Sequence, residues 1–96
     1  MPGPKFRLIL RRGPTPGQVY NLDQFPMTLG RDPANQLSID GAGVSRRHAQ
    51  LNLSGEALVL EDLGSSNGTY VNGERLTAAR HLQAGDRVNL GQNIEF

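Results

Sequence analysis

Three glycine-rich segments of the chain carry side chains whose chemistry suits an anionic ligand. They read GRDPANQ (residues 30–36), GAGVSRRH (41–48) and LGSSNGT (63–69). Arg31 and Arg46 can each present a planar fork of N–H donors to oxygen atoms. Four hydroxyl groups accompany these arginines, on Ser45, Ser65, Ser66 and Thr69. The glycines add backbone N–H groups that no side chain obstructs.

A phosphate group fits this set of donors. It carries a charge of about −1.5 to −2 at neutral pH and three strong acceptor oxygens. Its recognition requires positive charge, fork geometry and hydroxyl donors that converge from rigid loops. Asn67 can both donate and accept hydrogen bonds, which suits the backbone of a peptide. Composition alone leaves open whether the three segments converge.

The dipeptide Asn-Gly occurs twice within seven residues, at 67–68 and at 72–73. Asn-Gly between strands is a strong signal for a tight hairpin, because both residues tolerate a positive φ. Only residues 69–71 separate the two pairs, so any strand between them must be very short. The pattern leaves open whether both pairs are turns or whether one of them belongs to a site.

The elements that would position these segments alternate apolar and polar residues, which is the period of a half-buried strand. The 12 glycines and 6 prolines divide the chain into short pieces. The pattern predicts an all-β sandwich or barrel. The expected inward-facing residues are Phe6, Leu8, Leu10, Phe25, Met27, Leu29, Leu37, Ile39, Ala49, Leu51, Leu53, Leu58, Leu60, Val88 and Leu90.

Two further segments can be classified by composition. Residues 11–18 (RRGPTPGQ) are typical of an exposed loop. Residues 74–84 (ERLTAARHLQA) contain good helix formers with no Gly or Pro, and by propensity alone they predict a short helix.

Length, charge and composition restrict the classes of function. The 96 residues favour a single domain, and no Cys is present, which excludes disulfides and Cys-based metal sites. The net charge of +1 argues against a dedicated nucleic-acid binder. No apolar run reaches the length of a membrane span, and the first residues lack the apolar stretch of a signal peptide. We therefore expect a soluble, cytoplasmic domain with no membrane contact.

Two other classes of function deserve weighing. Ser45 and His48 invite a hydrolase interpretation, but a Ser three residues before a His, without a nucleophile-elbow sequence, gives no evidence of a positioned base. Two histidines far apart in the sequence argue against a metal site. A nucleic-acid interpretation would use Arg11, Arg12, Arg46 and Arg47, and it predicts binding that falls steeply with added salt.

The order and spacing of four motifs together resemble the forkhead-associated (FHA) domain. The motifs are Gly30-Arg31, Ser45-x-x-His48, Asn67-Gly68 and Asn72-Gly73. The resemblance covers nearly the whole chain. It implies an antiparallel β-sandwich of about eleven strands with little or no helix, so that residues 74–84 would form short strands and a turn. It also implies one domain over residues 1–96, cut from a longer protein, with a last strand that is incomplete.

The resemblance assigns roles to individual residues. By analogy the phosphate contacts are Arg31, Ser45, Arg46 and Ser66, the contact to the peptide main chain is Asn67, and the scaffold residues are Gly30, His48 and Gly68. The position two before Ser45 often helps to select the residue three after the phosphothreonine in this family. Here it is Gly43, and we expect weak selectivity through that position.

The function that the resemblance implies is a phosphothreonine-dependent peptide-binding module in signalling. Its partner would be a protein or peptide that a Ser/Thr kinase has phosphorylated. We expect no enzymatic activity, no cofactor and no metal, and we expect the isolated domain to be a monomer. The alternative is an interaction or assembly domain on the same fold that does not depend on phosphorylation.

Overall fold

The computed structural model describes residues 6–96, and within them it contains eleven strands and no helix. The strands are β1 Phe6–Ile9, β2 Val19–Leu22, β3 Met27–Gly30, β4 Leu37–Ser38, β5 Ala49–Ser54, β6 Ala57–Asp62, β7 Thr69–Val71, β8 Glu74–Arg75, β9 Arg80–Leu82, β10 Val88–Leu90 and β11 Ile94–Glu95. This confirms the all-β prediction. Residues 6–96 therefore contain no helix long and apolar enough to span a membrane.

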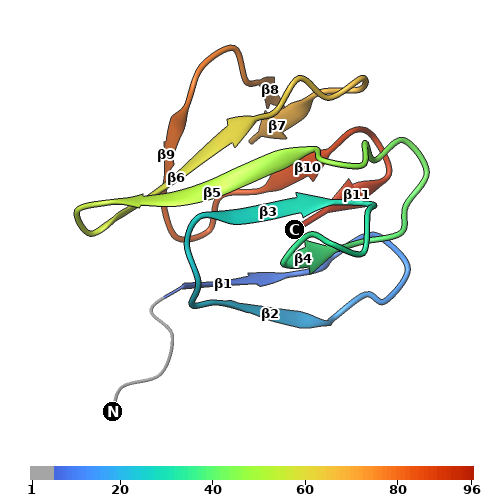
Figure 1. The fold of residues 1–96 in the computed structure, drawn as a ribbon, viewed down its shortest axis with the longest axis horizontal. Helices are drawn as coiled ribbons and strands as arrows, with labels where there is room; N and C mark the ends of the chain where they lie inside the picture. Colours follow the sequence, from blue (N-terminus) through green and yellow to red (C-terminus); the bar gives the residue numbers. More distant parts are fainter. Residues whose placement is uncertain (1–5) are drawn as a thin grey trace.

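The strands form two layers (Figure 1). One layer has the order β4-β3-β5-β6-β9, and its longest ladder pairs β5 with β6 along all six residues of each strand. The other layer contains β11-β10-β7-β8, which the β1-β2 hairpin joins through a bridge between Arg12 and Glu95. All strand pairs except β3-β4 are antiparallel. The expected antiparallel sandwich is therefore confirmed.

The core lies between the layers and follows the alternation of the strands. Its buried residues are Leu8, Leu10, Leu22, Met27, Leu29, Leu37, Ile39, Val44, Ala49, Leu51, Leu58, Leu60, Val71, Val88, Leu90, Ile94 and Phe96. Most of the predicted inward-facing positions are among them. Phe6 and Phe25 are only partly buried against this core, and the prediction for Leu53 was wrong, since it is 45% exposed. Leu53 lies near the end of β5, where the hairpin to β6 extends past the core.

The segment 74–84 forms no helix, which contradicts its propensity and confirms the expectation from the FHA resemblance. It contains the two edge strands β8 and β9, which pair with β7 and β6. Leu76 and Leu82 pack against the core from these edges. Packing of the two leucines thus outweighs a weak helical preference. The pattern also missed β2, which forms the outer strand beside β1.

The connections that carry the polar motifs meet at one end of the sandwich (Figure 1). They follow β3, precede β5 and precede β7. The β10–β11 turn and residues 10–18 lie at the same end (Figure 1). Residues 11–18 are exposed except for Gly13, as predicted for a loop. Side chains from distant parts of the sequence can therefore converge there.

Candidate functional site

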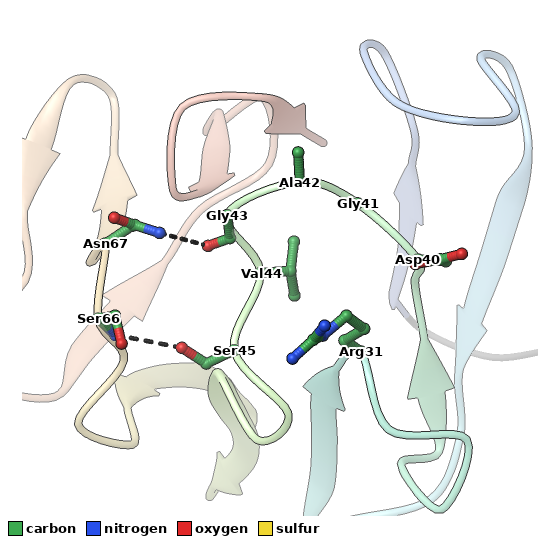
Figure 2. Close-up of a pocket in the computed structure, with 9 residues that line it drawn as sticks. All are labelled: Arg31, Asp40, Gly41, Ala42, Gly43, Val44, Ser45, Ser66 and Asn67. Atoms are coloured by element: carbon green, nitrogen blue, oxygen red, sulfur yellow. Dashed lines mark hydrogen bonds between the residues drawn. The ribbon is translucent and has the colours of Figure 1, made fainter.

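A groove of about 390 Å³ opens at this end of the sandwich. Its lining residues are Arg31, Asp40, Gly41, Ala42, Gly43, Val44, Ser45, Ser66 and Asn67 (Figure 2). The groove thus brings together four of the five predicted ligand contacts, from three separate loops. The fifth, Arg46, lies outside it.

Hydrogen bonds fix the main chain around Arg31, while its side chain extends without a hydrogen-bond partner among the described residues. Its N–H donates to the carbonyl of Ser45 at 3.0 Å, and the N–H of Asp32 donates to the carbonyl of Arg46 at 3.2 Å. The guanidinium group has no ion pair or hydrogen bond to any of residues 6–96. Figure 2 shows it extended toward Ser45. An exposed arginine on a fixed backbone is available for an anionic ligand.

Arg46 lines a neighbouring hollow of about 280 Å³ together with Arg31, Asp32 and Pro33. Arg31 therefore lies between the two hollows. The side chains of Arg46 and Arg47 are exposed and have no partner within residues 6–96. The geometry places Arg46 beside the groove rather than in its wall.

The two predicted serine hydroxyls face each other across the groove (Figure 2). The N–H of Ser66 donates to Oγ of Ser45 at 3.1 Å. The Ser45 hydroxyl is therefore an acceptor in this bond, and its own proton remains available. The Ser66 hydroxyl has no partner among the described residues. Both groups can donate to an oxygen placed between them and Arg31.

Asn67 connects two of the loops. Its Nδ2 donates to the carbonyl of Gly43 at 2.9 Å, which leaves Oδ1 and one N–H unused (Figure 2). Gly43 has a φ of +84°, and a Cβ atom there would lie 3.3 Å from Nδ2 of Asn67. A side chain at position 43 would therefore strain the backbone and press on Asn67.

His48 is fully buried beneath the groove and bridges two of its loops. Its Nδ1 accepts from the N–H of Ser45 at 3.1 Å, and its Nε2 donates to the carbonyl of Gly68 at 2.8 Å. This pattern fits a neutral ring with the proton on Nε2. Burial lowers the pKa of His48, although the bond to Gly68 and the charge of Asp62 oppose the shift. Because both ring nitrogens are occupied, His48 offers no base to the Ser45 hydroxyl, which removes the basis of the hydrolase interpretation.

Asp62 is a supporting residue that the sequence reasoning missed. Its carboxylate accepts hydrogen bonds from the N–H groups of Gly64 and Ser65, from the Ser65 hydroxyl and from the Thr69 hydroxyl. Burial acts to raise the pKa of Asp62, but these four hydrogen bonds outweigh it and lower the pKa below its usual value. The hydroxyls of Ser65 and Thr69, which looked available to a ligand, are thus used inside the scaffold. An Asp three residues before a Ser at a strand end is a signal for such a turn.

Gly30 and Asn35 fix the approach of β3 to the loop before β5. A Cβ atom on Gly30 would lie 2.1 Å from the carbonyl oxygen of Arg46, so no other residue fits there without moving the backbone. Nδ2 of the buried Asn35 donates to the carbonyls of Asp32 and Arg46, at 2.8 and 2.7 Å. Gly30 was predicted as scaffold, whereas Asn35 was missed because a lone Asn in a loop carries no distinctive signal.

Within residues 6–96, no group of three or more His, Asp or Glu side chains is arranged to hold a metal ion. The donors that remain free in the groove are the Arg31 guanidinium, the hydroxyls of Ser45 and Ser66 and one N–H of Asn67, and this set suits the binding of an anion.

Comparison with known proteins gives consistent results. The family described as "FHA domain" matches residues 27–91. The glycogen accumulation regulator GarA of Mycolicibacterium smegmatis is 40% identical over 92 residues, which cover 96% of this chain and 58% of GarA. The chain therefore spans little more than half the length of that relative.

Two solved structures are similar in fold. The FHA domain of the CT664 protein from Chlamydia trachomatis superposes with a TM-score of 0.84 at 27% identity, over 93% of this chain and 91% of that one. EmbR of Mycobacterium tuberculosis, solved in complex with a low-affinity phosphopeptide, gives 0.76 at 35% identity, over 82% of this chain and 21% of EmbR.

Proposed function

Because the chain belongs to the FHA domain family, we propose that it is a phosphothreonine-dependent peptide-binding module. The observation that carries the proposal is the groove in which the free guanidinium of Arg31 meets the unused hydroxyl protons of Ser45 and Ser66. These donors match the charge and the acceptor oxygens of a phosphate. The phosphopeptide bound to the similar protein EmbR supports the same class of ligand.

Each residue has a distinct role in this proposal. Arg31 supplies the charge, and Ser45 and Ser66 donate to the phosphate oxygens. Asn67 aligns the peptide through its free Oδ1 and its remaining N–H, while its other N–H holds Gly43 in place. Arg46 reaches the same phosphate from the adjacent hollow.

The proposal extends to the setting of the domain. The partner is a protein that a Ser/Thr kinase has phosphorylated, and the domain binds it as a non-catalytic monomer in the cytoplasm. Neither a cofactor nor a nucleic acid takes part. We expect a dissociation constant in the micromolar range, equivalent to about −8 kcal/mol at 1 μM.

The test is calorimetric titration of the chain with one peptide sequence in three forms, carrying phosphothreonine, phosphoserine or unmodified threonine. We expect binding of the phosphothreonine form, weaker binding of the phosphoserine form and none of the unmodified form. Equal binding of all three would contradict the proposal. Binding of a natural partner that survives phosphatase treatment would instead support the phosphorylation-independent alternative.

Arg31→Ala identifies the site within that experiment. Truncating one partner of a charged hydrogen-bonded pair costs about 2 kcal/mol or more, so affinity should fall about 30-fold or further. The melting temperature should not change, because the Arg31 side chain makes no hydrogen bond or ion pair with any of residues 6–96. Arg47→Ala is the matched control, since Arg47 is equally exposed and unpartnered but does not line the groove.

A further inference from the structure

Arg75 on the edge strand β8 contacts the loop that forms one wall of the groove between Arg31 and Asn67. It pairs with Tyr70 across the β7-β8 hairpin. A Cβ atom on Gly68 would lie 2.8 Å from Nε and 3.0 Å from Cζ of Arg75. Gly68 is buried although it belongs to a loop. The guanidinium group of Arg75 therefore lies directly against the backbone of Gly68.

This contact places a cation one residue away from the wall of the groove. Asn67 lines the groove and directly precedes Gly68, and consecutive Cα atoms lie about 3.8 Å apart. The Asn67 side chain extends toward Gly43 (Figure 2). An extended peptide advances about 3.3 Å per residue. A peptide that contacts Asn67 can therefore bring a side chain one or two positions away to the guanidinium of Arg75.

No acidic side chain among residues 6–96 neutralises Arg75. The neighbouring Glu74 instead pairs with Arg80, with 3.7 Å between Oε1 and Nη1. The guanidinium group of Arg75 has no ion pair or hydrogen bond to any of the described residues. Because the group is already held against a backbone, it loses less conformational freedom when it binds a ligand. Arg75 is thus available for a carboxylate of a bound peptide.

The opposite end of the groove carries the opposite charge. Asp40 lines the groove, and Figure 2 shows Asp40 and Asn67 on opposite sides of Arg31. The carboxylate of Asp40 would repel an acidic residue of a ligand, whereas Arg75 would attract one. An acidic side chain of a bound peptide is therefore favoured at only one end of the groove.

We propose that Arg75 is a specificity-determining residue, which selects an acidic side chain within two positions of the phosphothreonine. The inference rests on the proposed phosphopeptide function and adds a charge requirement to it. Arg31 meets the phosphate, and Arg75 forms an exposed ion pair with the neighbouring carboxylate. One exposed ion pair increases affinity about two- to fivefold. The partners are therefore phosphorylated segments that are also acidic on one side of the phosphothreonine.

The test is titration of the chain with a phosphothreonine peptide that has Ala at all flanking positions, and with four variants of it. Each variant carries a single Glu, at position −2, −1, +1 or +2. We expect one Glu position to bind about two- to fivefold more tightly than the Ala peptide. Arg75→Gln should bring that ratio of affinities to about one. Arg75→Glu should reverse the preference, so that Lys at the same position binds more tightly than Glu. A role limited to covering Gly68 would not produce this reversal.

Arg87→Gln is the matched control. Arg87 is equally exposed, but its main chain is bonded to Asn72 at the other end of β7. This variant should keep the preference for Glu. If no Glu position binds more tightly than Ala, or if the preference survives Arg75→Gln, the role of Arg75 is overturned while phosphothreonine binding stands. Failure of all five phosphopeptides to bind would instead contradict the function on which the inference rests.

Discussion

The two Asn-Gly dipeptides, identical in sequence, have different structural roles. At 72–73 both residues have a positive φ, +52° for Asn72 and +85° for Gly73, and the pair forms the hairpin turn between β7 and β8. At 67–68 only Gly68 has a positive φ. That pair closes the loop before β7, and Asn67 lines the groove that also contains Arg31, Ser45 and Ser66. The sequence pattern left open whether both pairs are hairpin turns, and in the structure only the pair at 72–73 forms one.

The contacts of the two pairs explain the difference. The Asn72 side chain ties its turn to the start of β10, through Asp86 and the N–H of Arg87. The Asn67 side chain ties its loop to Gly43, in the wall of the groove. The carbonyl of Gly68 accepts from both His48 and the N–H of Gly91. A dipeptide thus predicts a turn, while the loops packed against it decide whether the turn carries a site.

His48→Ala should show the largest effect, because it removes the support of the first pair. The substitution leaves the part-buried N–H of Ser45 without its acceptor, removes one of the two hydrogen bonds to the Gly68 carbonyl and opens a cavity. We expect a loss of about 3 kcal/mol or more in the free energy of unfolding, together with loss of phosphopeptide binding. Urea denaturation and peptide titration measure the two effects.

His81→Ala is the matched control for that experiment, since His81 is exposed on β9. It should change neither stability nor binding. A His48→Ala chain that stays as stable as the unaltered one would show that the buried bridge is not what holds the first Asn-Gly pair.

The next largest effects are expected when Asn67 and Asn72 are each replaced by Ala in separate variants. Asn67→Ala should weaken phosphopeptide binding about tenfold, since it removes both the proposed contact to the peptide main chain and the bond to Gly43, with little change in stability. Asn72→Ala should cost about 1–2 kcal/mol of stability through its two lost side-chain bonds, with binding preserved. Paired denaturation and titration measurements check this. Equal effects of both variants on binding would remove the distinction.

Replacement of Gly68 and of Gly73 should have smaller effects on stability and binding, and the two positions are more alike in backbone conformation than the two asparagines are. Both have nearly the same φ, +86° at Gly68 and +85° at Gly73, so Ala costs about 1 kcal/mol of stability at either position. A Cβ on Gly73 meets nothing within 4 Å, whereas one on Gly68 lies 2.8 Å from Nε of Arg75. Only Gly68→Ala should therefore also weaken phosphopeptide binding. A loss of affinity in Gly73→Ala, measured by titration, would contradict this.

Much of the architecture could be predicted from local patterns. Alternation located most strands because their apolar residues face a single core, as Leu58 and Leu60 do on β6. It failed at 74–84, where β8 and β9 are edge strands of two and three residues, too short for a period to outweigh helical propensity. Alternation also failed to locate β2. Val19 and Asn21 of this strand are exposed and only Leu22 is buried, so too few apolar residues mark an inward face.

The candidate site could be predicted only through the combination of motifs, since each motif alone is weak. Arg31, Ser45, Ser66 and Asn67 do meet in one groove. What the sequence could not show is how polar groups are shared among the loops. Ser65 and Ser66 look equivalent in sequence, yet Asp62 accepts from Ser65 while Ser66 faces the groove. Which of the two hydroxyls is bonded within the scaffold depends on contacts between segments that are distant in the sequence, and a local sequence pattern cannot predict such contacts.

The smallest expected effect is the pH dependence of the free energy of unfolding. It distinguishes the two Asn-Gly pairs, because His48 supports the pair at 67–68 and Asp86 supports the pair at 72–73. Burial lowers the pKa of His48 in the folded state below its ordinary value of 6.5. As the pH falls below 6.5, His48 becomes protonated in the unfolded chain but stays neutral in the folded chain. The free energy of unfolding therefore decreases. The pKa of Asp86, which supports Asn72, is lowered from 3.8, and its contribution is lost only as the pH falls below that value. Urea denaturation without ligand between pH 7 and 5 should therefore show a decline that His81→Ala retains. A flat profile in that range, or a decline that His81→Ala abolishes, would show that the first pair is not coupled to the protonation of His48.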